Sequence, residues 1–118
     1  MVCVKRREII AEGFEELSKT LTALGDSSRQ IIFTVLLEHI KPMRVGDIAE
    51  LSHFTRPSVS HHLKVLREAG LVDMFEEGTK NYYFIKADKE KWTKIKAVVD
   101  FTYESVTDGE THKNEVRK

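Results

Sequence analysis

The chain has 118 residues, of which 41% are hydrophobic and 32% charged, a composition typical of one soluble globular domain. No apolar run approaches the roughly 20 residues of a membrane-spanning helix, and the N-terminus lacks the apolar segment of a secretory signal. The single cysteine, Cys3, excludes a disulfide framework within the chain, so we expect a cytoplasmic protein with no membrane partner.

The formal net charge is zero, which argues against a uniformly basic surface. Cations nevertheless outnumber acids between Lys41 and Arg67, while acidic residues gather toward both ends of the chain. A neutral protein can therefore still present one basic face to a nucleic acid. The alternative is an ordinary solvated surface of mixed charge.

Apolar residues spaced alternately by four and three predict an amphipathic helix over about residues 8–23. Asp26 is a typical N-cap residue, and we expect a second helix over residues 29–39, limited by Pro42. A short third helix fits residues 45–52.

A tight turn at residues 52–55 leads to a fourth helix over about residues 56–69. Thr55 is its expected N-cap, Pro57 lies in the first turn where a missing N–H costs nothing, and Gly70 is the expected stop.

Beyond Gly70 the hydrophobic period changes from about 3.6 to 2. Residues 71–75 and 81–85 are rich in β-branched and aromatic side chains, and Gly78 lies between them, which predicts a β-hairpin. A last helix is expected over residues 89–106, followed by a flexible polar tail at 107–118.

The predicted fold is mainly α with a small β-hairpin, in the order α-α-α-α-β-β-α. Two short helices joined by a tight turn and followed by a hairpin form a winged helix-turn-helix. We expect residues 1–118 to make a single domain, with its core over about residues 8–106.

The fourth helix carries the candidate nucleic-acid contacts. With Val59, Leu63 and Leu66 facing the core, the outward face presents hydroxyls, an imidazole and cations, which can contact phosphates and base edges. The predicted DNA-binding residues, including two at the hairpin tip, are Arg56, Ser58, Ser60, His61, Lys64, Thr79 and Lys80. The alternative is that this face is polar only because it is exposed. His62 is expected to be a partly buried packing residue rather than a ligand.

The stretches Val45–Leu51 and Arg56–Val72, the latter containing the run Val-Ser-His-His-Leu-Lys-Val-Leu-Arg-Glu-Ala-Gly-Leu, closely resemble the ArsR/SmtB family of bacterial repressors. Leu24–Ile32 and the Gly78 and Tyr82-Tyr83 region are similar to that family as well, so the resemblance covers about residues 17–100.

The resemblance implies a homodimer in which the first and last helices pack between subunits. Both helices carry broad apolar stripes, which would be buried favourably against a partner. The predicted dimer-interface residues are Phe14, Leu17, Leu21, Trp92, Ile95, Val99 and Tyr103. The alternative is that the stripes only close the core of the monomer.

Many members of this family sense metal, but the residues of their usual sites are missing here. Arg44 and Gly46 stand where the paired cysteines would be, and residues 88–106 contain no histidine. We therefore expect no metal and no cofactor at these positions. An unusual metal site or an intersubunit disulfide through Cys3 is an alternative.

The expected function is sequence-specific binding of double-stranded DNA as a transcriptional regulator, a repressor by family resemblance. It acts either constitutively or under an unidentified small-molecule or metal effector. The alternative is a winged-helix module for protein interaction without DNA. The sequence has no glycine-rich phosphate loop, nucleophile elbow or zinc-ligand spacing, so we do not expect an enzyme.

Overall fold

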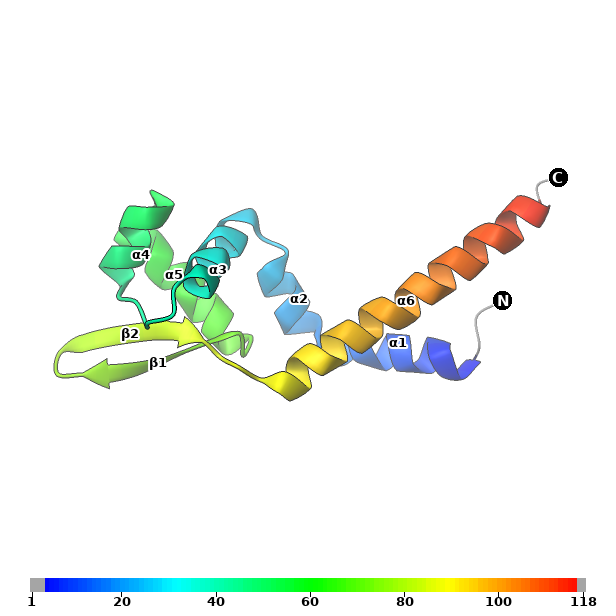
Figure 1. Cartoon of the computed structure of the whole chain (residues 1–118), viewed down its shortest axis with the longest axis horizontal. Helices are drawn as coiled ribbons and strands as arrows, with labels where there is room; N and C mark the ends of the chain where they lie inside the picture. The colour runs from blue at the N-terminus through cyan, green and yellow to red at the C-terminus, as the bar shows by residue number, and fades with distance from the viewer. Residues whose placement is uncertain (1–3, 117–118) are drawn as a thin grey trace. The chain divides into compact units, whose positions relative to one another are not determined.

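A computed structural model describes the backbone of residues 4–116 and the side chains of residues 4–108. The elements, in chain order, are α1 (Val4–Glu16), α2 (Ser18–Leu24), α3 (Ser27–Glu38), α4 (Val45–Ser52), α5 (Arg56–Glu68), β1 (Val72–Glu77), β2 (Lys80–Ile85) and α6 (Lys89–Val116) (Figure 1). They form two compact units. We call residues 19–87 the central unit, and the residues up to Ser18 together with those from Asp88 onward the terminal unit.

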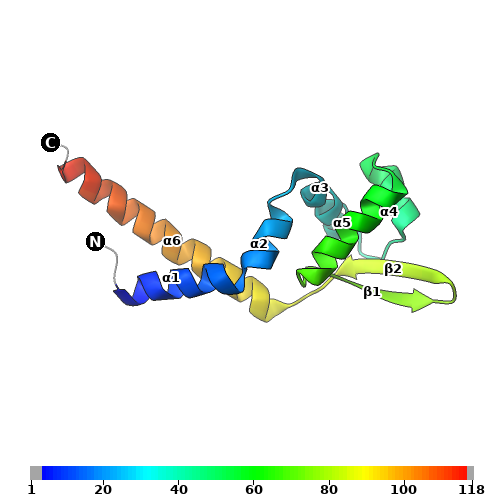
Figure 2. The same cartoon turned by 180° about the vertical axis from the view of Figure 1, so that it is seen from behind.

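The central unit is built around one apolar core. Helices α3, α4 and α5 and the hairpin all contribute to it (Figures 1 and 2). The predicted inward face of α5 is confirmed, because Val59, Leu63 and Leu66 are completely buried. Ile32 of α3 and Ile48 of α4 are equally buried, so the three helices share one core and their outer faces are fixed by it.

Local capping sets the starts of two helices as the sequence predicts. The Asp26 carboxylate accepts a hydrogen bond from the backbone N–H of Arg29 at 3.0 Å, which opens α3. The Thr55 hydroxyl accepts one from the backbone N–H of Ser58 at 3.3 Å, which opens α5. At the far end of α5, Gly70 has a φ of 77°, a left-handed conformation that favours glycine after a helix.

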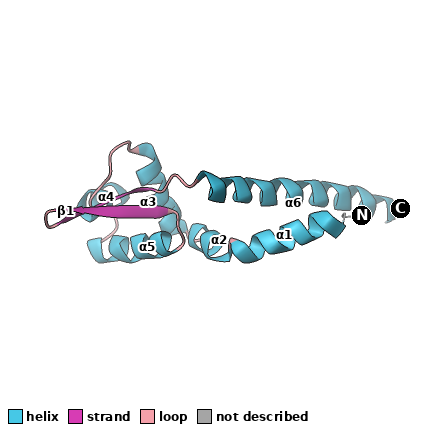
Figure 3. Cartoon of the chain, turned by 90° about the horizontal axis from the view of Figure 1, so that it is seen from below, coloured by secondary structure: helices cyan, strands magenta, loops and turns pink. Residues whose placement is uncertain are grey.

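The hairpin is antiparallel, with a register that runs from Val72 opposite Ile85 to Glu77 opposite Lys80. Gly78 has a φ of 65° in the turn between the strands. The backbones of Met43 and Tyr83 exchange two hydrogen bonds of 2.8 Å, which ties β2 to the segment before α4. Figure 3 shows β1 extending beside α5.

The first predicted helix differs from the structure. It is interrupted at Leu17, so that α1 and α2 replace the single helix expected over residues 8–23. A one-residue interruption leaves the hydrophobic spacing almost unchanged, so the pattern alone could not indicate it.

The last helix is longer than predicted and continues to Val116 instead of ending near residue 106. The Arg6 guanidinium contacts Glu104 at 3.5 Å and Asp108 at 3.0 Å, so polar contacts between α1 and α6 extend past residue 106. Hydrophobic periodicity indicates where a helix is packed and does not mark its end.

In the terminal unit α1 packs closely on α6. Gly13 faces the buried side chain of Val98, and a Cβ added at Gly13 would overlap the Val98 Cγ2 methyl. None of the helices among the described residues combines the length and the apolar character needed to cross a bilayer.

Candidate nucleic-acid interface

The polar face of α5 is oriented by its buried stripe. Because Val59, Leu63 and Leu66 are fixed in the core, the side chains on the opposite half of the helix point to solvent. Of the five residues predicted on this face, Ser58 is half-buried. The other four are exposed, namely Arg56, Ser60, His61 and Lys64.

Arg56, at the first turn of α5, lies against the start of α4. A Cβ added at Gly46 would be only 2.9 Å from the Arg56 Nη2 atom, so glycine at position 46 makes room for the guanidinium. The neighbouring Asp47 carboxylate accepts a hydrogen bond of 3.4 Å from the backbone N–H of Arg44. Arg44 thus takes part in capping the start of α4, and Gly46 makes room for Arg56.

The two predicted wing residues lie at the turn of the hairpin. Thr79 and Lys80 are exposed, and Glu77 stands opposite Lys80 in the register. The hairpin is stiffened by aromatic contacts, because the rings of Phe75 and Tyr82 stack with their centroids 5.4 Å apart. The tip of the wing thus belongs to a hairpin that aromatic packing stabilises, and its one cation, Lys80, lies opposite the acidic Glu77.

Sequence reasoning missed two residues at this surface, Arg67 and Tyr83. They line a groove of about 540 Å³ together with Ser60, Lys64 and Glu68. The spacing of the α5 members follows one helical stripe and could have indicated Arg67. Tyr83 comes from β2, and only the packing of the hairpin beside α5 brings it to the groove.

His62 links α5 to the start of α3, as expected of a packing histidine. It is half-buried, and its Nδ1 lies 3.4 Å from the Arg29 Nη1. Arg29 is itself held by a hydrogen bond of 2.9 Å from its Nε to the Ala23 carbonyl oxygen. Since a guanidinium can only donate, the Nδ1 of His62 accepts, which assigns the proton of the neutral ring to Nε2.

The surroundings of His62 favour its neutral form. Burial lowers the pKa of His62 below 6.5, and the positive charge of Arg29 and the neighbouring His61 act in the same direction, while Asp26 opposes them. The pKa of Asp26 is also lowered, chiefly because its carboxylate accepts the backbone N–H of Arg29.

These contacts predict a pH dependence of stability near neutrality. An unfolded chain protonates His62 around pH 6.5, whereas the folded chain does so only at lower pH. The unfolded state therefore binds more protons in this window, and the free energy of unfolding should fall as the pH decreases through it. Urea unfolding of the wild type and of His62→Gln, which keeps an acceptor for Arg29 but cannot titrate, measures the effect between about pH 7.5 and pH 5.

The matched control is His61→Gln, which removes an exposed imidazole from the adjacent position. We expect His61→Gln to keep the acid-dependent loss of the wild type and His62→Gln to reduce it. Equal pH dependence of the wild type and His62→Gln would show that His62 does not contribute.

Comparison with known proteins identifies the family of the chain. The family described as bacterial regulatory protein, arsR family, matches residues 26–74. An HTH-type transcriptional regulator of Methanocaldococcus jannaschii is 36% identical over 80 residues, which cover 68% of this chain and 89% of the relative. The chain belongs to the ArsR family.

A second relative and a solved structure agree with this assignment. The transcriptional repressor SdpR of Bacillus subtilis is 33% identical over 67 residues, which cover 57% of this chain and 72% of the repressor. A homodimeric winged helix-turn-helix DNA-binding domain of Mycobacterium bovis has the same fold, with a TM-score of 0.59, 24% identity and 88% coverage of each chain. The protein is a winged helix-turn-helix DNA-binding transcriptional regulator, with α4 and α5 as the helix-turn-helix and β1–β2 as the wing.

The predicted dimer residues of this ArsR-family chain differ in exposure. Leu17 is only 4% exposed, so its surface is already covered within the chain. Phe14, Val99 and Tyr103 are 47%, 58% and 69% exposed and line an apolar hollow of about 430 Å³ in the terminal unit. Trp92 also lies at the surface of this unit, and Ile95 is half-buried there. Leu21 is half-buried and belongs to the central unit.

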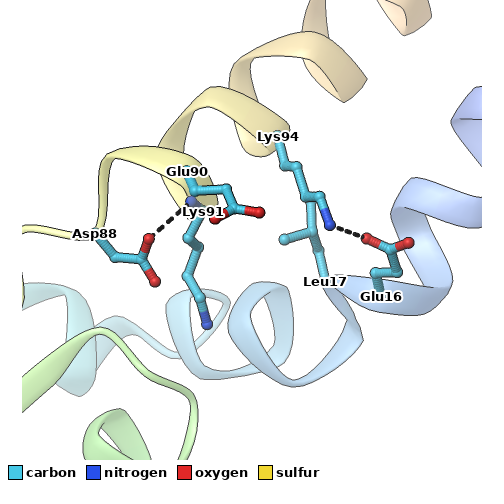
Figure 4. Close-up of a pocket in the computed structure, with 6 residues that line it drawn as sticks. All are labelled: Glu16, Leu17, Asp88, Glu90, Lys91 and Lys94. Carbon is cyan, nitrogen blue, oxygen red and sulfur yellow. Dashed lines mark hydrogen bonds and ion pairs between the residues drawn. The ribbon is translucent and has the colours of Figure 1, made fainter.

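A second pocket of the terminal unit is lined by charged side chains (Figure 4). Its volume is about 300 Å³, and the Lys94 ammonium contacts the Glu16 carboxylate at 2.6 Å. The Asp88 carboxylate accepts the backbone N–H of Lys91 at 3.1 Å and so caps the start of α6. The carboxylates of Glu16 and Asp88 are therefore each bonded to a donor within the pocket.

No group of three or more candidate metal ligands gathers among the described residues. Cys3, the residue of the alternative redox or metal site, lies outside them.

Proposed function

We propose that this ArsR-family regulator is a repressor that binds an inverted-repeat operator as a homodimer in the cytoplasm. The helix α5 enters the major groove, and the wing contacts the adjacent backbone. The proposed contacts are those of Arg56, Ser58, Ser60, His61, Lys64, Thr79 and Lys80. The observation that carries the proposal is the complete burial of Val59, Leu63 and Leu66, because it turns the polar half of α5 outward.

In this proposal the central unit binds DNA and the terminal unit forms the dimer interface, and the two make up one functional domain. The exposed apolar residues Phe14, Val99 and Tyr103 support a dimer through the terminal unit, as does the homodimeric relative from Mycobacterium bovis. A twofold dimer would place two α5 helices about one turn of DNA apart. The protein has no catalytic role in this proposal, and it acts either constitutively or under an unidentified small-molecule or metal effector.

Selection of bound sequences from a random duplex pool, at near-physiological salt, tests the proposal. We expect an enriched inverted repeat and an affinity that falls steeply with salt, because bound phosphates release counterions. Lack of enrichment together with a shallow salt dependence would overturn it and favour a protein-interaction module.

Replacing Ser60 and His61 together by alanine should weaken specific binding by about tenfold or more, since one good base contact contributes about 1–3 kcal/mol. The measurement is the affinity for the selected operator relative to an unrelated duplex. Both side chains are exposed, so the free energy of unfolding should stay within about 0.5 kcal/mol of the wild type.

The control for this pair is Thr34→Ala with His39→Ala, which removes a hydroxyl from an exposed position within α3 and an imidazole from the exposed position just after its end. We expect the control to bind the operator like the wild type. If the Ser60 and His61 variant does so too, the assignment of the α5 face is wrong.

A further inference from the structure

The groove beside α5 extends the proposed DNA contacts toward the wing. Ser60 and Lys64 line it and also belong to the predicted DNA-binding face, so the two surfaces are continuous. Arg67 and Glu68 continue the same stripe of α5, and Tyr83 adds a phenol from β2. The groove, of about 540 Å³, lies wholly within the central unit.

The groove contains donors suited to an anion. Lys64 and Arg67 supply two cations, and the hydroxyls of Ser60 and Tyr83 can donate hydrogen bonds. The guanidinium of arginine presents a planar fork that matches the oxygens of a phosphate. Glu68 is the one carboxylate in the lining and would oppose an anion.

Arg67 is held in place by a weak and replaceable contact. Its Nε lies 3.5 Å from the Asp73 Oδ1, and the two side chains are 52% and 43% exposed. A solvent-exposed ion pair of this kind contributes about 0–1 kcal/mol, so an incoming phosphate can compete for the guanidinium. The same Asp73 oxygen accepts the backbone N–H of Met74 at 2.8 Å, which fixes the carboxylate on β1.

We propose that the groove binds a phosphodiester of the DNA strand that passes between α5 and the wing. Arg67 and Lys64 are the main ligands, and Asp73 is the counter-ion that Arg67 leaves when DNA arrives. The proposal rests on the proposed DNA-binding function and adds Arg67, Tyr83 and the opposing Glu68 to its interface.

The salt dependence of operator binding by Arg67→Gln tests the assignment. Because a bound dimer carries two copies of Arg67, the loss of both phosphate contacts should reduce the slope of log K against log salt concentration by about 1.8, or about 0.9 per subunit. Operator and unrelated duplexes should lose affinity by similar factors, because a phosphate carries no sequence information. An unchanged slope for Arg67→Gln would overturn the proposal.

Asp73→Asn separates phosphate binding from the ion pair. It removes the charge that holds Arg67 and keeps an oxygen for the N–H of Met74. We expect Asp73→Asn to keep the slope of the wild type and to bind DNA at least as tightly. If Asp73→Asn instead weakens binding as much as Arg67→Gln does, Arg67 acts only by supporting the wing.

Glu68→Gln provides a test by gain of affinity. Its control, Glu38→Gln, makes the same change of charge at an exposed position of α3. Glu68→Gln should bind both duplexes more tightly than Glu38→Gln, and an equal or weaker affinity would contradict a phosphate beside Glu68. If the wild type itself shows no salt-dependent duplex binding, the proposed function fails along with the groove. A wild type that binds while Arg67→Gln keeps its slope refutes the groove alone.

Discussion

Leu63→Ala is expected to lower the free energy of unfolding by about 2–5 kcal/mol, the range for a large aliphatic side chain removed from a packed core. Leu63 is completely buried and lies on the face of α5 that meets the other helices and the hairpin. The loss has two parts: the hydrophobic free energy that burial of the removed methyl groups contributes in the wild type, and the cost of the cavity left in their place. Urea unfolding followed by circular dichroism measures it, at one protein concentration because dimerisation adds to the apparent stability.

Lys64→Ala is the matched control for stability, because it shortens the next side chain of α5 at an exposed position. We expect the control to change the free energy of unfolding by no more than about 0.5 kcal/mol. A loss for Leu63→Ala as small as that would mean that α5 is not oriented by its buried stripe, and the assignment of its outer face would fail with it.

The parts of the fold that follow from local chemistry could be predicted from the sequence. Asp26 and Thr55 cap the helices that they were expected to open, and α4 has the predicted bounds Val45–Ser52. A short polar side chain at an N-cap and a glycine with positive φ act within one turn of the chain. Their effect therefore does not depend on the rest of the fold.

Features that depend on distant contacts could not be predicted in this way. Leu17 and Val99 both belong to apolar stripes, yet Leu17 is 4% exposed and Val99 is 58% exposed. Periodicity assigns both to a buried face and cannot tell a contact within the chain from one with a partner. The groove was missed for a related reason, because Arg67 and Tyr83 meet only when the hairpin packs beside α5.

Val99→Glu is expected to prevent dimerisation and to weaken operator binding by about 10²–10⁴-fold, the factor gained when two linked modules bind two linked sites. Val99 lies beside Phe14 and Tyr103 in the apolar hollow of the terminal unit. Burial of a carboxylate in an apolar interface is costly, so the two subunits should separate. Because Val99 is exposed in the single chain, the charge should leave the fold of each subunit intact.

Sedimentation equilibrium measures dimerisation. The ratio of the affinities for the complete operator and for one half-site measures how much dimerisation contributes to DNA binding. Thr93→Glu is the control, since it adds the same charge to an exposed position of α6 about 120° around the helix from Val99. We expect Thr93→Glu to remain a dimer and to prefer the complete operator. Val99→Glu should be a monomer with similar affinity for the half-site and the operator. A dimeric Val99→Glu protein would show that this apolar surface does not hold the subunits together.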